Sequence, residues 1–180
     1  MNLGTLETHG DRSVLRYERH LKHPIDRVWS AITEPDEIVR WLAAAEVDLA
    51  EGGRVRLEWL NTNEHGERYE KAVAEGRITA LDPPRLIEYD TDVHGALRWE
   101  LDEAPGGTRL QLTVNIALPE DRVTENRSGW HVHLDFLEDA LEGGAIDWPN
   151  WPRDRWAAIH ERYIRPEQSR QPVRPRASAP

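Results

Sequence analysis

The chain has 180 residues, of which 38% are hydrophobic, and a formal net charge of −10 at pH 7. This length is typical of a single domain that buries a substantial core. A strongly acidic surface repels nucleic acid and anionic lipid, so neither is an expected partner. The chain contains no cysteine, which excludes disulfide bonds and thiolate chemistry.

Targeting signals are not expected in this sequence. The N-terminal stretch MNLGTLETHGDRSVLRYERH lacks the apolar run of a signal sequence, and nowhere are there about 18 consecutive apolar residues. We therefore predict a cytoplasmic protein with no membrane insertion. The oligomeric state is left open between monomer and homodimer.

The two ends of the chain differ in composition from its centre. Residues 1–12 are predicted to be flexible. Residues 165–180 hold four arginines, four prolines and one glutamate. Such a segment cannot bury enough apolar surface to offset the entropy of ordering it, so a disordered basic tail is expected.

The first elements are a strand and two short helices. Residues 14–21 alternate between apolar and polar positions, which predicts a strand. Pro24 then opens a helix that places Ile25, Val28 and Trp29 on one face. A second short helix is expected over residues 36–42.

A series of strands follows. The segment RVRLEWL, residues 54–60, alternates with period two, as do residues 96–101 and 108–118. Residues 68–80 predict a longer strand with a bulge near Gly76, and residues 86–90 predict another. Because the connections are short, the strands are expected to form an antiparallel meander.

A long helix closes the predicted domain. Trp130, Leu134, Leu137 and Leu141 form a narrow apolar stripe, and Gly143-Gly144 ends the helix. The fold class is therefore α+β, with a curved antiparallel sheet of about six or seven strands wrapped around this helix. Residues 13–144 make up the domain. Residues 145–164 form a tryptophan-rich extension whose short helix packs back on it.

Three stretches resemble a known superfamily. They are HPIDRVWSAITEPDEIVRWL (residues 23–42), GTRLQLTV (residues 107–114) and SGWHVHLDFLEDALEG (residues 128–143). In order and spacing they are similar to the START-like or SRPBCC superfamily, which has the helix-grip fold. The branch they resemble is named after the C-terminal domain of the activator of heat-shock-protein-90 ATPase.

The resemblance implies a cavity between the sheet and the long helix. Members of the superfamily include lipid carriers, cyclases, hormone receptors and co-chaperone domains, so the fold does not name a function. A strongly curved sheet cannot contact a straight helix along its whole length. A hollow lined by large side chains is therefore expected.

Tryptophans are the leading candidates for the wall of this cavity. Trp59 and Trp99 occupy inward positions on separate strands, Trp41 ends the second helix, and Trp130 lies on the long helix. Converging indoles make a flat apolar site with N–H donors at its rim. A core that is simply rich in tryptophan is the alternative, and both interpretations stay open for Trp59 and Trp99.

The histidine pair of the HVH triplet does not predict a metal site. Residues two apart on a helix point about 200° apart, so His131 and His133 cannot easily share an ion. We expect His131 to form a surface pair with Asp135. His133 flanks the apolar stripe near Leu137. There it either orients a bound molecule or acts as an acid or base, or it is a core histidine with satisfied hydrogen bonds.

The predicted function is binding of a small hydrophobic or aromatic molecule. The candidate ligand-binding residues are Trp41, Trp59, Tyr69, Trp99, Trp130, His133 and Leu137. Two alternatives remain: an enzyme of the cyclase, hydrolase or isomerase type, with His133 or Tyr69 carrying a proton, and a chaperone-interacting module. No phosphate loop, serine elbow or zinc spacing is present, so no cofactor and no metal are expected.

Overall fold

The computed structural model of the protein describes residues 3–63, 65–67 and 72–165. Its strands are β1 (Thr5–His9), β2 (Arg12–Leu21), β3 (Ala44–Val47), β4 (Arg54–Glu58), β5 (Val73–Asp82), β6 (Leu86–Thr91), β7 (Gly95–Ala104) and β8 (Gly107–Ala117). Its helices are α1 (Ile25–Thr33), α2 (Pro35–Ile38), α3 (Glu120–Leu141), the 3₁₀ turn η1 (Trp148–Asn150) and α4 (Arg153–Ile164).

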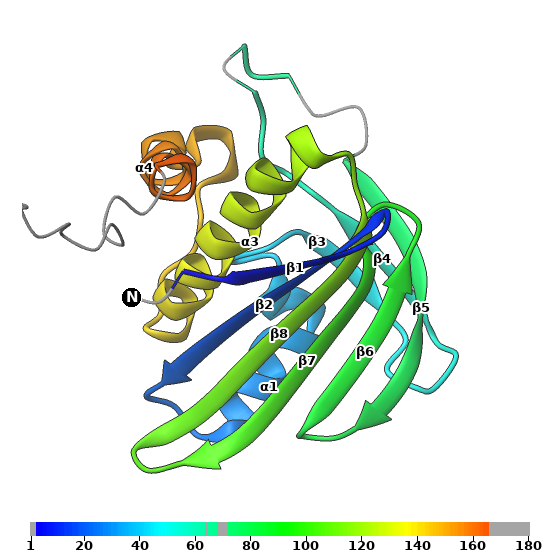
Figure 1. The fold of residues 1–180 in the computed structure, drawn as a ribbon. Helices are drawn as coiled ribbons and strands as arrows, with labels where there is room; N and C mark the ends of the chain where they lie inside the picture. The colour runs from blue at the N-terminus through cyan, green and yellow to red at the C-terminus, as the bar shows by residue number, and fades with distance from the viewer. Residues whose placement is uncertain (1–2, 64, 68–71, 166–180) are drawn as a thin grey trace, which may run out of the picture.

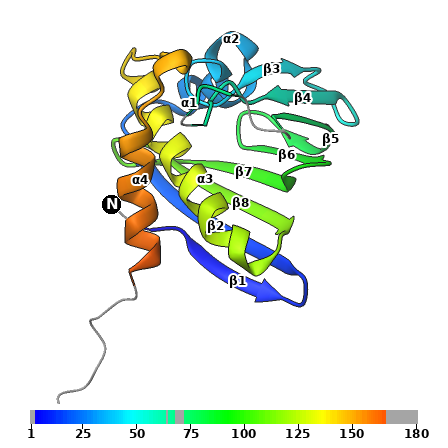
Figure 2. The ribbon, with the colours of Figure 1, turned by 90° about the horizontal axis from the view of Figure 1, so that it is seen from above.

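The strands form one curved antiparallel sheet with α3 on its concave side (Figure 1). The strand order is β1-β2-β8-β7-β6-β5-β4-β3, so β1 and β3 are the edges. Figure 2 shows the strands fanning out from β1 to β3, with α1 and α2 near the β3 end. This arrangement confirms the predicted α+β helix-grip fold, with eight strands among the described residues instead of six or seven.

Alternating side chains explain why the sheet has one buried face. In β8, the residues Leu110, Leu112, Val114 and Ile116 alternate along the strand and are all buried. In β4, Val55 and Leu57 are buried in the same way. The period-two pattern of these segments matches the pleat of a strand, which places every second residue on the core side.

The C-terminal segment returns along the outer side of α3. Figure 2 shows α4 lying beside α3 on the side away from the sheet. Two indole N–H groups hold the turn before α4, because Trp148 donates to the carbonyl of Val39 at 2.7 Å and Trp151 donates to that of Thr62 at 2.9 Å. Ile159 of α4 is buried. The helix therefore covers a face of α3 that would otherwise meet solvent.

Several local features differ from the prediction. The sequence pattern predicts neither β1 nor β3, and it extends the second helix to residue 42, whereas α2 ends at Ile38. β5 does contain a register shift, but it lies between Ile78 and Ala80 and not at Gly76, near which the bulge is predicted. Gly76 instead allows a close approach of strands, because a Cβ atom there would lie 1.9 Å from the carbonyl oxygen of Asp90.

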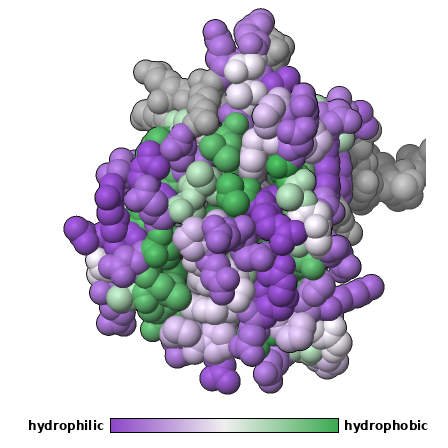
Figure 3. Space-filling model, turned by 180° about the vertical axis from the view of Figure 1, so that it is seen from behind, coloured by the Kyte–Doolittle hydropathy of each residue, from purple (hydrophilic) through white to green (hydrophobic). Residues whose placement is uncertain are grey.

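The face of the molecule seen in Figure 3 is largely hydrophilic. On the face seen in Figure 3, apolar residues form separate groups between hydrophilic ones. None of the helices in the described residues is long and apolar enough to span a bilayer. The residues predicted to form the disordered tail, from 166 onward, lie outside the described part of the chain, as does the candidate Tyr69.

Candidate functional site

Four tryptophans from four different segments meet between the sheet and α3. The Trp41 and Trp99 ring centroids are 5.9 Å apart, and those of Trp99 and Trp130 are 6.2 Å apart. Trp59 lies 6.4 Å from Trp130, and all three pairs have an edge-to-face geometry. This geometry suits the quadrupoles of the rings. The convergence that the strand and helix patterns predicted is therefore present.

His94 is a fifth member that the sequence analysis missed. Its imidazole lies 4.2 Å from the ring of Trp59 at an angle of 34°, and 5.9 Å from Trp130 in an edge-to-face contact. We call Trp41, Trp59, His94, Trp99 and Trp130 the aromatic cluster. His94 lies in the turn between β6 and β7, where no apolar periodicity marks a residue as inward-facing.

The β6–β7 turn has a local design that fixes His94. The hydroxyl of Thr91 accepts the backbone N–H of His94 at 3.0 Å and donates to the carbonyl of Gly95 at 3.3 Å. Gly95 has φ of +64°, and a Cβ atom there would lie 2.3 Å from the carbonyl oxygen of Asn115. Only glycine combines this backbone conformation with so close an approach. The turn therefore aims the imidazole at Trp59.

The chemistry of His94 is that of a neutral imidazole. Burial is the main cause that lowers its pKa to about 4, the nearby His133 lowers it further, and Asp92 acts in the opposite direction. Its Nδ1 atom is buried and has no hydrogen-bond partner among the described residues. Buried polar side-chain atoms in native proteins nearly always have a partner. It is the buried side-chain polar atom of the aromatic cluster that lacks a partner in the described structure.

The indole donors of the cluster's inner members are already in use. Trp41 donates to the carbonyl of Ala31 at 2.9 Å, and Trp99 donates to the hydroxyl of Tyr89 at 3.1 Å. Tyr89 is buried, and its burial raises its pKa to about 12. Trp41 and Trp99 therefore do not supply the free N–H donors that the sequence analysis expected at a cavity rim. These two hydrogen bonds hold the Trp41 and Trp99 rings in place within the cluster.

His133 and Leu137 are both buried on α3. The Nδ1 atom of His133 lies 3.0 Å from the carbonyl of Trp41, and because a carbonyl only accepts, Nδ1 carries the proton. Burial lowers the pKa of His133 to about 4, although the bond to Trp41 raises it in part. The neutral ring therefore keeps Nε2 as an acceptor. Its neighbours are Phe136 and Trp148, with centroids at 5.7 and 6.2 Å.

The aromatic rings touch one another where the sequence predicted a hollow. Large indoles in edge-to-face contact occupy the space between the curved sheet and α3. The described residues do line a shallow depression, formed by Glu46, Val47, Asp48 and Arg54 at the β3 edge of the sheet. This depression is formed by none of the predicted site residues.

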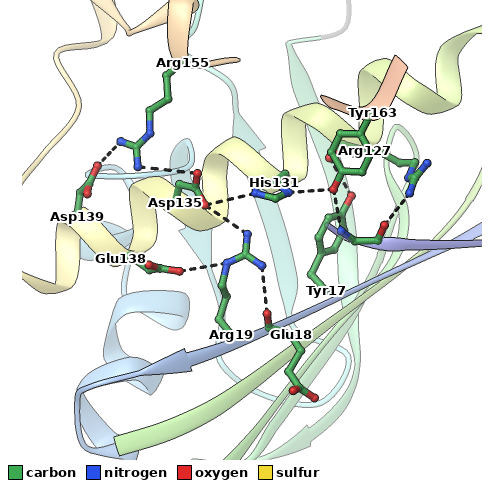
Figure 4. Close-up of polar contacts among 11 residues, drawn as sticks. Tyr17, Glu18, Arg19, Arg127, His131, Asp135, Glu138, Asp139, Arg155 and Tyr163 are labelled. Carbon is green, nitrogen blue, oxygen red and sulfur yellow. Dashed lines mark hydrogen bonds and ion pairs between the residues drawn. The ribbon is translucent and has the colours of Figure 1, made fainter. Parts of the chain in front are cut away.

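A second group of functional side chains lies on the other side of α3, against α4 and β2 (Figure 4). Arg19 of β2 is buried, and its guanidinium lies 3.3 Å from Asp135 and 3.1 Å from Glu138. Arg155 of α4 pairs with Asp139 and lies 3.9 Å from Asp135. Burial raises the pKa of Asp135, and the two arginines offset part of that effect. These contacts hold α4 and β2 to α3.

His131 connects this group to the N-terminus. Its Nδ1 lies 2.9 Å from the hydroxyl of Tyr163, which accepts the backbone N–H of Gly4 at 2.8 Å. Its Nε2 faces Asp135 at 3.7 Å. Burial and then the charge of Arg19 lower the pKa of His131 to about 4. Arg127 stacks over Tyr163 at 4.4 Å. Figure 4 shows the resulting chain of polar groups.

The predicted surface pair of His131 and Asp135 is therefore wrong. Both side chains are buried, with 0% and 3% of their surface exposed. A helical wheel of α3 placed them on its polar side, but α4 covers that side. The available signal was the spacing of Trp156, Ile159 and Tyr163, which places them together on one face of the last helix and calls for a surface to pack against. In the described residues no cluster of three or more potential metal ligands occurs.

Comparison with known proteins identifies the family. A family model described as "Activator of Hsp90 ATPase homolog 1-like protein" matches residues 22–142, which is most of the chain. The chain belongs to this family. The resemblance seen in the three sequence stretches is thereby confirmed, and membership of the family supports a ligand-binding domain in general. A search of curated proteins finds no match.

Solved structures of the same fold agree with the family assignment. CalU16 from Micromonospora echinospora is 25% identical, with a TM-score of 0.59 over 89% of this chain and 92% of that one. An AHSA1-like protein from Aeromonas hydrophila is 23% identical, with a TM-score of 0.58 over 72% and 92% of the two chains. A conserved protein of unknown function from Enterococcus faecalis reaches a TM-score of 0.67 at 19% identity, over 89% and 88%.

Proposed function

We propose that the protein binds a small hydrophobic or aromatic molecule at the aromatic cluster. The observation that carries this proposal is the meeting of Trp59, Trp130 and His94, whose rings offer flat apolar faces around a buried, unpartnered nitrogen. Because buried polar atoms are nearly always partnered, this nitrogen leaves a place for a polar group of a ligand. Membership of a family of ligand-binding domains supports the same conclusion.

Trp59 is the proposed point of entry. It follows the last residue of β4 and is 9% exposed, whereas Trp41 and Trp99 are each 1% exposed. The ligand enters by separating Trp59 from its neighbours and replaces ring–ring contacts by ring–ligand contacts. Moving the Trp59 ring aside breaks its contacts with His94 and Trp130, and contacts of these rings with the ligand offset that loss.

Calorimetric titration with naphthalene, a rigid apolar aromatic, tests the proposal. We expect saturable one-to-one binding with a negative heat-capacity change, which marks burial of apolar surface. The conservative variant Trp59→Phe changes the ring against which the ligand packs, so its affinity should shift by about threefold or more. Trp156→Phe is the matched control, because Trp156 stacks on His160 of α4 outside the cluster.

Two results would overturn this function. One is the absence of binding heat up to the solubility limit of naphthalene. The other is an affinity that is the same in the wild type, Trp59→Phe and Trp156→Phe. An enzymatic or chaperone-interacting role stays an untested alternative, since no contact of the described residues favours either one.

A further inference from the structure

We infer that the ligand of the aromatic cluster is an aromatic molecule with a hydroxyl group, and that His94 is the residue that selects it. This inference rests on the proposed function and adds the chemical class of the ligand. Its basis is the position of His94 Nδ1, which is buried among indole rings without a partner in the described structure. A polar atom in that position makes a flat apolar site selective for molecules that carry a matching polar group.

The geometry supplies both parts of such a site. The ring of His94 lies 4.2 Å from that of Trp59 and is tilted from it by 34°, so a planar ligand that packs against Trp59 in the plane of the imidazole places a hydroxyl on its edge next to Nδ1. Trp130 meets both rings edge-on and limits the position of the ligand from the side. The ring of His94 is fixed by the Thr91 hydroxyl and the Gly95 turn, so it is oriented before the ligand arrives.

The charge state of the imidazole favours a neutral hydroxyl over an ionic group. A neutral imidazole has one nitrogen that donates and one that accepts, and a hydroxyl matches either of them because it both donates and accepts. His133, whose Nδ1–H is held by Trp41, adds a second neutral imidazole near His94. The aromatic cluster itself contains no charged side chain that would pair with a carboxylate or an ammonium. An ionic ligand would therefore lose its hydration without compensation.

Comparing 2-naphthol with naphthalene measures this selectivity, because the two probes differ only in the hydroxyl. In the wild type, 2-naphthol should bind about tenfold more tightly, the size expected when a buried polar group gains its missing partner. In His94→Phe the preference should disappear, because the hydroxyl then enters an apolar site. His20→Phe, which alters an exposed histidine of β2, should keep the wild-type ratio.

The outcomes separate this inference from the proposed function. If naphthalene binds but 2-naphthol binds no more tightly, or if His94→Phe keeps the tenfold preference, the role of His94 is wrong while the binding function stands. If neither probe binds the wild type, the proposed function itself fails. Far-ultraviolet circular dichroism and a cooperative melt establish that His94→Phe is folded. If it is not folded, His94→Gln replaces it, and the preference should then fall but not vanish, because the amide still hydrogen-bonds.

Discussion

Three histidines make the stability of the fold depend on pH in a calculable way. His94, His131 and His133 each have a pKa of about 4 in the folded protein, with burial as the first cause, against 6.5 for an unperturbed histidine. The unfolded chain therefore binds three protons as the pH falls through 6.5, whereas the folded protein binds them only near pH 4. The stabilisation is complete above pH 6.5 and is lost as the pH falls toward 4.

The expected loss follows from these values. Between pH 7.5 and 5.5, each histidine lowers the free energy of unfolding by somewhat more than about 1 kcal/mol, so the three together remove roughly 4 kcal/mol. Total stabilities of domains are about 5–15 kcal/mol, so this is a large share. Burial raises the pKa of Asp135 and Glu138, which gives a dependence of opposite sign above their unperturbed values of 3.8 and 4.5. Variants of single histidines separate the two contributions.

Urea denaturation at a series of pH values measures this dependence. His133→Asn keeps a donor for the carbonyl of Trp41 but does not titrate, so it should remove about one third of the pH dependence whatever its effect on stability at pH 7.5. The exposed-site variant His20→Asn should leave the dependence unchanged. The reasoning about buried neutral imidazoles would be refuted if the free energy of unfolding changed by less than about 1 kcal/mol between pH 7.5 and 5.5.

Two further predictions concern the contacts of α3 with β2, α4 and the N-terminal segment. Asp135→Asn should destabilise the fold by about 3 kcal/mol, which is near the low end for breaking a buried ion pair because Glu138 still pairs with Arg19. The double variant Arg19→Met/Asp135→Leu should lose less stability than the sum of its two single variants. Additive losses in urea denaturation would contradict this expectation. Tyr163→Phe leaves Gly4 N–H and His131 Nδ1 without partners, so it should cost about 1–3 kcal/mol and speed amide hydrogen exchange in β1; unchanged exchange in β1 would show that the hydroxyl does not anchor this strand.

The sequence predicted the fold best where one element carries its own pattern. β4 and β8 alternate with period two, and the apolar stripe of α3 repeats at helical spacing, so each shows its buried face without reference to the rest of the chain. β1 could not be predicted because all five of its residues are exposed and its sequence shows no alternation of apolar and polar residues. Its position as an edge strand is set by pairing with β2, which is a property of two segments together.

The candidate site was predictable only in part for the same physical reason. Trp99 and Trp130 lie on inward positions of β7 and α3, and Trp41 and Trp59 follow closely after α2 and β4, so the convergence of the four indoles could be predicted from the fold. His94 lies in a turn, and its orientation depends on Thr91 and Gly95 and not on any repeat. His131 and Asp135 are buried by α4, a helix far along the chain, so a wheel of α3 alone assigned them to the solvent side.

The indole N–H signals of the protein test its ligand-binding role most directly. The chain has eight tryptophans, so a ¹⁵N-correlated NMR spectrum shows eight indole N–H signals, one from each tryptophan. Addition of naphthalene should shift the signals of Trp59, Trp99 and Trp130 in a saturable manner and leave those of Trp29 and Trp156 in place. A spectrum in which the three cluster signals stay fixed while naphthalene is added to saturation of the solution would contradict binding at the aromatic cluster.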